Sequence, residues 1–142
     1  MADEAPLIFH ARLGGLFPVN MAAKEAMKGI DGQCVVKVTR ATRNQRRRSL
    51  YWCVASTVVE LLNDMHSLSL SDQDLHHITR AKVGLFEPVD LPSGEVFKRL
   101  KSTSDKAMPE PERAAYTDKA FKLWSRWIGV PVETLTREAE AA

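Results

Sequence analysis

The feature that most constrains the fold is segment 49–63, which contains neither glycine nor proline and repeats apolar side chains at steps of three and four residues. Its apolar positions include Leu50, Val54, Val58, Leu61 and Leu62. This spacing places the apolar side chains on one side of an α-helix. The sequence therefore predicts a helix over residues 49–63.

Two shorter helices and a longer one follow from local end signals. Asn20 is a good N-cap for residues 21–28, and Ser71 with Asp74 resembles a capping box that opens a helix ending near Gly84. Pro109 and Pro111 suit the start of a last helix that ends at Gly129. Trp124 and Trp127, three residues apart on it, are expected in the core, with a subunit interface as the alternative.

Three segments have the composition of strands. Residues 7–12 end at a Gly-Gly turn, residues 34–39 combine β-branched side chains with a preceding turn, and residues 95–100 belong to an irregular hairpin over 86–103. The strongest strand prediction is 34–39.

These elements predict an α+β fold in which a small mixed or antiparallel sheet packs against two or three helices. The sheet is expected to contain strands 7–12 and 34–39, with 95–100 as a further candidate. We expect residues 1–131 to form a single domain, and residues 132–142 to be a frayed helix or a disordered tail.

Composition favours a soluble cytoplasmic protein. The 142 residues are 44% hydrophobic, enough for a core without disulfide or metal staples. Cys34 and Cys53 stand inside apolar runs without a C-x-x-C partner, which predicts two reduced, buried thiols. No apolar stretch approaches the roughly 20 residues of a membrane span, and the acidic N-terminus is unlike a secretion signal.

Positive charge is concentrated in one segment. Between Asp31 and Glu60 there is no acidic residue, although the whole chain carries 20 basic and 18 acidic residues. Arginine guanidinium groups fork onto phosphates, and an exposed aromatic ring can stack on an unpaired base. The segment therefore predicts a nucleic-acid site made of Lys37, Arg40, Arg43, Asn44, Gln45, Arg46, Arg47, Arg48, Tyr51 and Trp52.

Each residue type has an expected role in that site. The basic side chains would hold phosphates, Asn44 and Gln45 would touch sugars or base edges, and one of the two aromatics would stack. An anion at this helix start would also relieve the unfavourable position of Arg46 to Arg48 in the helix dipole. The alternative is a solvated loop, or a docking surface for acidic protein, with Tyr51 and Trp52 in the core.

Catalysis, a cofactor and a metal site are not expected. Adjacent His76 and His77 point about 100° apart on a helix, so they cannot chelate one ion as a pair four residues apart can. Asp72 and Asp74 with His76 could form a hydrolytic site, but no further set of spaced carboxylates supports it. The chain has no phosphate-binding loop, dinucleotide fingerprint or nucleophile elbow.

The pattern resembles a family of tailed-phage and prophage proteins classified as a domain of unknown function. The pieces that carry the resemblance are Gly15 to Val19, Gly32 to Val36, Arg43-Asn44, Arg48 to Trp52 and Ser102 to Met108. Asp105 stands where that family's serine-rich motif has an aromatic residue.

Residues Arg43 to Cys53 are also similar, more faintly, to the NinB or Orf recombination mediators of lambda-like phages. In both, a strand leads to a basic segment with Asn and Gln and then to a helix with a tryptophan, although here Asn44-Gln45 precedes the arginines. This resemblance implies a homodimer that binds single-stranded DNA, with a host single-strand-binding protein as a partner. We therefore expect an accessory protein of recombination or replication that binds DNA or RNA, with single strands favoured.

Overall fold

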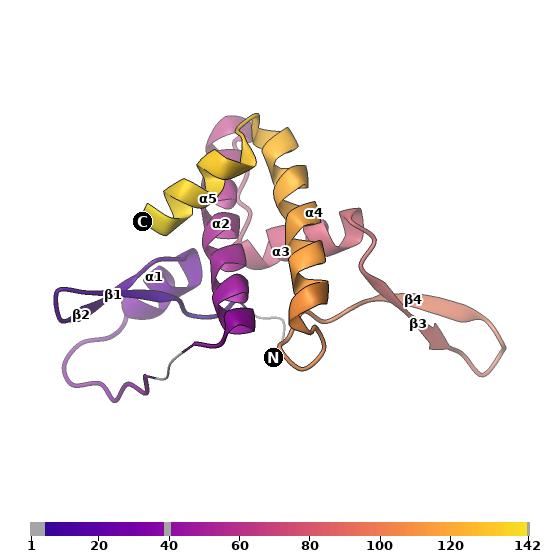
Figure 1. The fold of residues 1–142 in the computed structure, drawn as a ribbon, viewed down its shortest axis with the longest axis horizontal. Coiled ribbons are helices and arrows are strands. Elements are labelled where there is room, and N and C mark those ends of the chain that lie inside the picture. Colours follow the sequence, from indigo (N-terminus) through magenta and orange to yellow (C-terminus); the bar gives the residue numbers. More distant parts are fainter. Residues whose placement is uncertain (1–4, 39–40, 142) are drawn as a thin grey trace.

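The computed structural model describes residues 5–38 and 41–141 (Figure 1). Within them the chain forms five helices and two antiparallel two-stranded sheets, which confirms the α+β class. The long helices α2 (Arg43–His66) and α4 (Glu110–Ile128) stand side by side, and both begin at the same end of the molecule. α3 (Asp72–Lys82) crosses behind them.

The core lies where α3, α4 and α5 (Val132–Ala141) pack against α2. Trp124 is fully buried, and its indole Nε1 donates a hydrogen bond to Thr79 Oγ1 at 2.8 Å. This confirms the core position of Trp124, while Trp127 packs against the core half-buried. The buried apolar residues of α2 are Tyr51, Trp52, Val54, Ala55, Val58, Val59 and Leu62.

Most of the predicted helix ends are confirmed. α1 (Met21–Met27) is capped by the side chain of Asn20, and α3 has the reciprocal capping box of Ser71 and Asp74. α4 ends at Gly129, whose φ of 71° is in the left-handed region that favours glycine. Residues 132–141, for which a frayed helix or disorder was expected, form α5, and its Leu135 is fully buried.

The strands form two separate hairpins instead of one sheet. β1 (Phe9–Arg12) pairs with β2 (Gly15–Pro18), and β3 (Phe86–Asp90) pairs with β4 (Val96–Leu100). The second hairpin confirms the one predicted over 86–103, and it projects from the helices as an arm (Figure 1). The expected sheet that joins strands 7–12 and 34–39 is wrong.

Residues 34–38 are not a strand, and Thr39 of the predicted segment lies outside the described residues. Val35, Val36, Val38 and Cys34 are exposed. The prediction failed because β-propensity reports how well a side chain fits a half-buried sheet, and this segment has no neighbouring strand in the described chain.

The prediction that Cys34 is buried was also wrong, because it lies on this exposed segment. Cys53 is half-buried, and burial together with the Asp72 carboxylate raises its pKa to about 11.

Candidate nucleic-acid interface

The arginine-rich segment forms the first turns of α2, six residues before the start that the apolar spacing predicted. Thr42 caps the helix: its Oγ1 accepts from Gln45 N at 3.1 Å, and Gln45 Oε1 accepts from Thr42 N at 2.9 Å. This capping box satisfies two backbone groups that would otherwise lack partners at a helix start. The basic side chains are therefore held on a helix instead of a loop.

Arg43, Arg46, Arg47 and Leu50 share one side of α2, which we call the arginine face. They line a surface hollow of about 430 Å³. Arg43 and Arg46 are exposed, and neither makes an ion pair within the described part of the chain. Arg47 Nε donates to Glu110 Oε1 at 2.7 Å, which ties the first turns of α2 and α4 together. The face thus offers two uncommitted guanidinium groups and a third that is partly engaged.

The structure gives Asn44 and Gln45 internal partners in place of the predicted sugar or base contacts. Asn44 Oδ1 accepts from Arg113 Nε at 2.5 Å, and Asn44 Nδ2 donates to the carbonyl of Met108 at 3.2 Å. Gln45 is part of the capping box. Both amides serve the fold, because each satisfies groups that would otherwise have no partner.

Tyr51 and Trp52 are buried, with 2% and 1% of their surfaces exposed, so neither ring can stack on a base. The helix geometry explains the burial of Trp52, while Tyr51 is buried by its contacts with His76 of α3 and Tyr116 of α4. At about 100° per residue, Trp52 lies roughly 180° around α2 from Arg43. The sequence predicted a helix that begins at Ser49, after the arginines. It therefore could not predict the angle around the helix axis between the arginines and the aromatic residues.

Among the predicted residues that the structure describes, Lys37 and Arg48 do not line the hollow of the arginine face. Lys37 is on the exposed segment before α2, and Arg40 lies outside the described residues. Arg48 is half-buried and lines a different hollow, with Ser49, Asp105 and the start of the chain around Pro6. The structure therefore brings together only part of the predicted set.

A buried polar network joins α2, α3 and α4. Tyr51 Oη is 2.6 Å from His76 Nδ1 and 2.7 Å from Tyr116 Oη, and His76 Nε2 is 3.1 Å from Thr103 Oγ1. Burial, followed by the neighbouring Tyr116, raises the pKa of Tyr51 well above its usual value, so the phenol stays neutral. These contacts hold α2, α3 and α4 in register.

Arg113 joins this network from α4. It is 2% exposed, and its Nη2 donates to the carbonyl of Thr103 at 2.6 Å in addition to the Asn44 contact. Burial lowers its pKa, while the Asp105 carboxylate, 3.4 Å from Nη2, acts in the opposite direction. A guanidinium remains charged in proteins, so each of these acceptors compensates a buried charge.

The residues considered for a hydrolytic site are not gathered around a metal position. Asp72 accepts from Ser56 Oγ at 3.1 Å, while His76 contacts Tyr51 and Thr103 and His77 is exposed. Among the described residues, no group of three or more His, Cys, Asp and Glu side chains could hold a metal ion.

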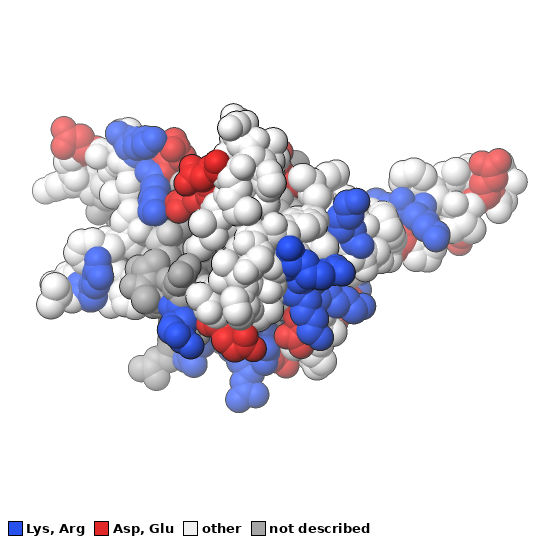
Figure 2. Space-filling view, turned by 90° about the horizontal axis from the view of Figure 1, so that it is seen from above, with Lys and Arg blue, Asp and Glu red and all other residues white. Residues whose placement is uncertain are grey.

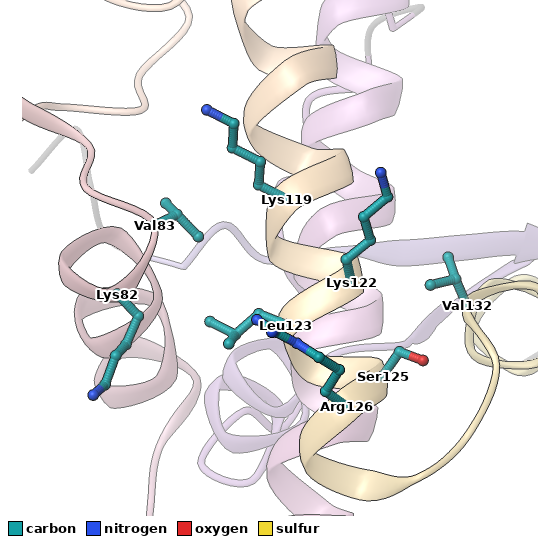
Figure 3. Close-up of a pocket in the computed structure, with 8 residues that line it drawn as sticks. All are labelled: Lys82, Val83, Lys119, Lys122, Leu123, Ser125, Arg126 and Val132. Carbon is teal, nitrogen blue, oxygen red and sulfur yellow. The ribbon is translucent and has the colours of Figure 1, made fainter.

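A second basic surface was missed by the sequence analysis. Lys119, Lys122 and Arg126 of α4 meet Lys82 at the end of α3, around the apolar Val83, Leu123 and Val132 (Figure 3). Together with Ser125 these residues line an open cavity of about 650 Å³, which we call the basic groove. The cations of α4 are three and four residues apart, and this spacing could have predicted that they share one face of a helix. The contribution of Lys82 could not be predicted, because it depends on how α3 and α4 pack.

No protein-family model, curated protein or solved structure matches this chain. None of the helices within the described residues combines the length and the apolar composition that a membrane crossing requires.

Proposed function

We propose that this protein binds DNA or RNA through the arginine face, as a non-catalytic cytoplasmic accessory factor. The observation that carries the proposal is the exposure of Arg43 and Arg46 without ion pairs to described residues, at a helix start where positive charge is unfavourable. The helix dipole penalises a cation there by a few tenths of a kcal/mol. A bound phosphate would reverse that penalty, because it meets both guanidinium groups and the positive end of the dipole.

The mode of binding follows from the groups that the face offers. Guanidinium groups grip phosphate oxygens, and phosphate contacts position a protein without reading sequence. The buried aromatics offer no stacking surface, and Asn44 and Gln45 make hydrogen bonds within the fold. The face therefore supports sequence-independent binding to the backbone, and the preference for single strands has no support from Tyr51 and Trp52. An accessory role in phage recombination or replication, with a homodimer as the active form, rests on the resemblance alone.

The test is equilibrium binding of fluorescently labelled single-stranded and double-stranded oligonucleotides at low salt. Arg43→Ala with Arg46→Ala should weaken binding by on the order of tenfold. The matched control is Lys24→Ala with Lys28→Ala, which removes two exposed charges from α1 and its C-cap and should bind as the parent does. An equal loss in both variants would show that only net charge matters.

A second candidate function is docking of an acidic protein segment on the same face. It is favoured by the Arg47–Glu110 ion pair, which shows that an arginine of this face binds a carboxylate. Absence of DNA and RNA binding by the parent protein at low salt would contradict the first proposal and leave this one. Magnesium-dependent cleavage of the oligonucleotides would contradict the non-catalytic part of the proposal.

A further inference from the structure

The basic groove presents both charge and apolar surface to solvent. Figure 3 shows Val83 and Leu123 between α3 and α4, with Lys119, Lys122 and Arg126 along the outer side of α4. Seen from above, Lys and Arg side chains also gather beside the root of the β3–β4 arm (Figure 2). The eight residues that line the groove include four cations and no carboxylate.

Helix stabilisation explains only half of this charge. Lys82 and Arg126 stand in the last turns of α3 and α4, where a cation interacts favourably with the helix dipole. Lys119 and Lys122 lie farther back along α4 and receive no such benefit. None of the four cations makes an ion pair with any carboxylate that the structure describes.

We propose that the basic groove binds an acidic peptide segment of a partner protein, whose apolar side chains cover Val83, Leu123 and Val132. Carboxylates of such a segment would pair with the lysines and Arg126 at the rim, where charge complementarity sets the association rate and the choice of partner. The apolar floor would supply affinity by burial. A cavity of about 650 Å³ is within the usual range for ligand sites.

The lining favours a peptide over a nucleic acid. It contains no aromatic ring on which a base could stack and no Asn or Gln side chain to contact a base edge. A phosphate backbone would use the four cations but would leave the apolar floor uncovered. An acidic peptide with apolar side chains satisfies both parts of the groove.

The groove is also distinct from the arginine face. Lys119 to Arg126 lie 9 to 16 residues beyond Glu110 along α4, which corresponds to about 14 to 24 Å of helix at 1.5 Å per residue. The two surfaces can therefore be tested separately, and the peptide proposal does not depend on nucleic-acid binding.

The experiment measures fluorescence anisotropy of a labelled synthetic peptide of about eight residues in which Asp alternates with Leu and Phe. The full-length parent protein should bind it with an affinity that falls with salt. Two further peptides divide the contributions: one replaces Leu and Phe by Ser, and the other replaces Asp by Lys. Both should bind at least about tenfold more weakly, because each keeps only one of the two complementary features.

The protein variants locate the site. Lys119→Ala with Lys122→Ala should weaken peptide binding on the order of tenfold, while Lys24→Ala with Lys28→Ala should bind the peptide as the parent does. Two results would overturn the proposal: no binding of the acidic peptide by the parent, or equal binding of the Ser-containing peptide. Loss of oligonucleotide binding in the Lys119 and Lys122 variant, with peptide binding unchanged, would assign the groove to nucleic acid instead.

Discussion

The two sides of α2 carry different residues: the arginine face has cations directed to solvent, and the sides that face the core have an amide and two aromatic rings. On the arginine face, Arg43 and Arg46 are exposed and make no ion pair with another described residue. On the sides of α2 that face the rest of the core, Asn44, Tyr51 and Trp52 are held by contacts to α3, α4 and the segment before α4. Proximity in sequence thus says little about shared function, because residues one or two positions apart on a helix face different surroundings. Substitutions on the buried side should affect folding, and those on the arginine face should affect binding.

The largest effect is expected for Trp52→Ala. The ring is 1% exposed and lies 4.7 Å from the ring centre of His76, so truncation should lower the free energy of unfolding by about 3 to 5 kcal/mol. Chemical denaturation measures this loss. A variant that unfolds like the parent but binds single strands more weakly would place Trp52 on the binding side after all.

Asn44→Ala should have the next largest effect. The change leaves Arg113 Nε and the carbonyl of Met108 without their partner, which should cost about 1 to 3 kcal/mol of unfolding free energy. Asn44→Asp is the matched control, because it keeps an acceptor for the guanidinium. Unchanged stability together with weaker oligonucleotide binding would contradict the structural role of Asn44.

Asp72, which is buried against α2, should make the stability of the fold depend on pH. Burial raises its pKa, since the hydrogen bond from Ser56 of α2 does not offset the loss of solvent. The folded protein therefore holds this proton more tightly than the unfolded chain, and stability falls as pH rises from the unfolded pKa through the folded one.

Asp72→Asn tests that sign, because the amide does not titrate and can still accept from Ser56. The difference in melting temperature between variant and parent should grow in favour of the variant as pH rises from about 3 to about 8. A difference that shrinks over this range would mean that the ionised carboxylate stabilises the fold.

The contrast also shows which parts of the structure could be predicted. Asn20, Ser71 and Gly129 act within a few residues, and the helix ends that depend on them were predicted from the sequence. The strand at 34–39 was predicted wrongly because strand formation depends on a distant partner, which local composition does not reveal.

The candidate site divides in the same way. A run of arginines is visible in the sequence, whereas the burial of Tyr51 and Trp52 depends on where α2 begins and on the surface it meets. Lys82 joins the basic groove only because α3 ends beside α4. The contacts that the tertiary fold creates were therefore the features that the sequence could not predict.

The smallest effect on stability is expected for Arg43→Ala with Arg46→Ala. Both side chains are exposed at the positive end of the helix dipole, so the free energy of unfolding should stay the same or rise by a few tenths of a kcal/mol. Thermal and chemical denaturation provide the measurement. A loss above about 1 kcal/mol would show that the arginine face contributes to folding.

The salt dependence of nucleic-acid binding tests the role of the arginine face most directly. If Arg43, Arg46 and Arg47 neutralise roughly three phosphates, the slope of log K against log salt should be about −2 to −3, and the double variant should reduce its magnitude by about 1.5. The Lys24 and Lys28 control should keep the parent slope. An affinity indifferent to salt, or a slope that the double variant leaves unchanged, would contradict binding through this face.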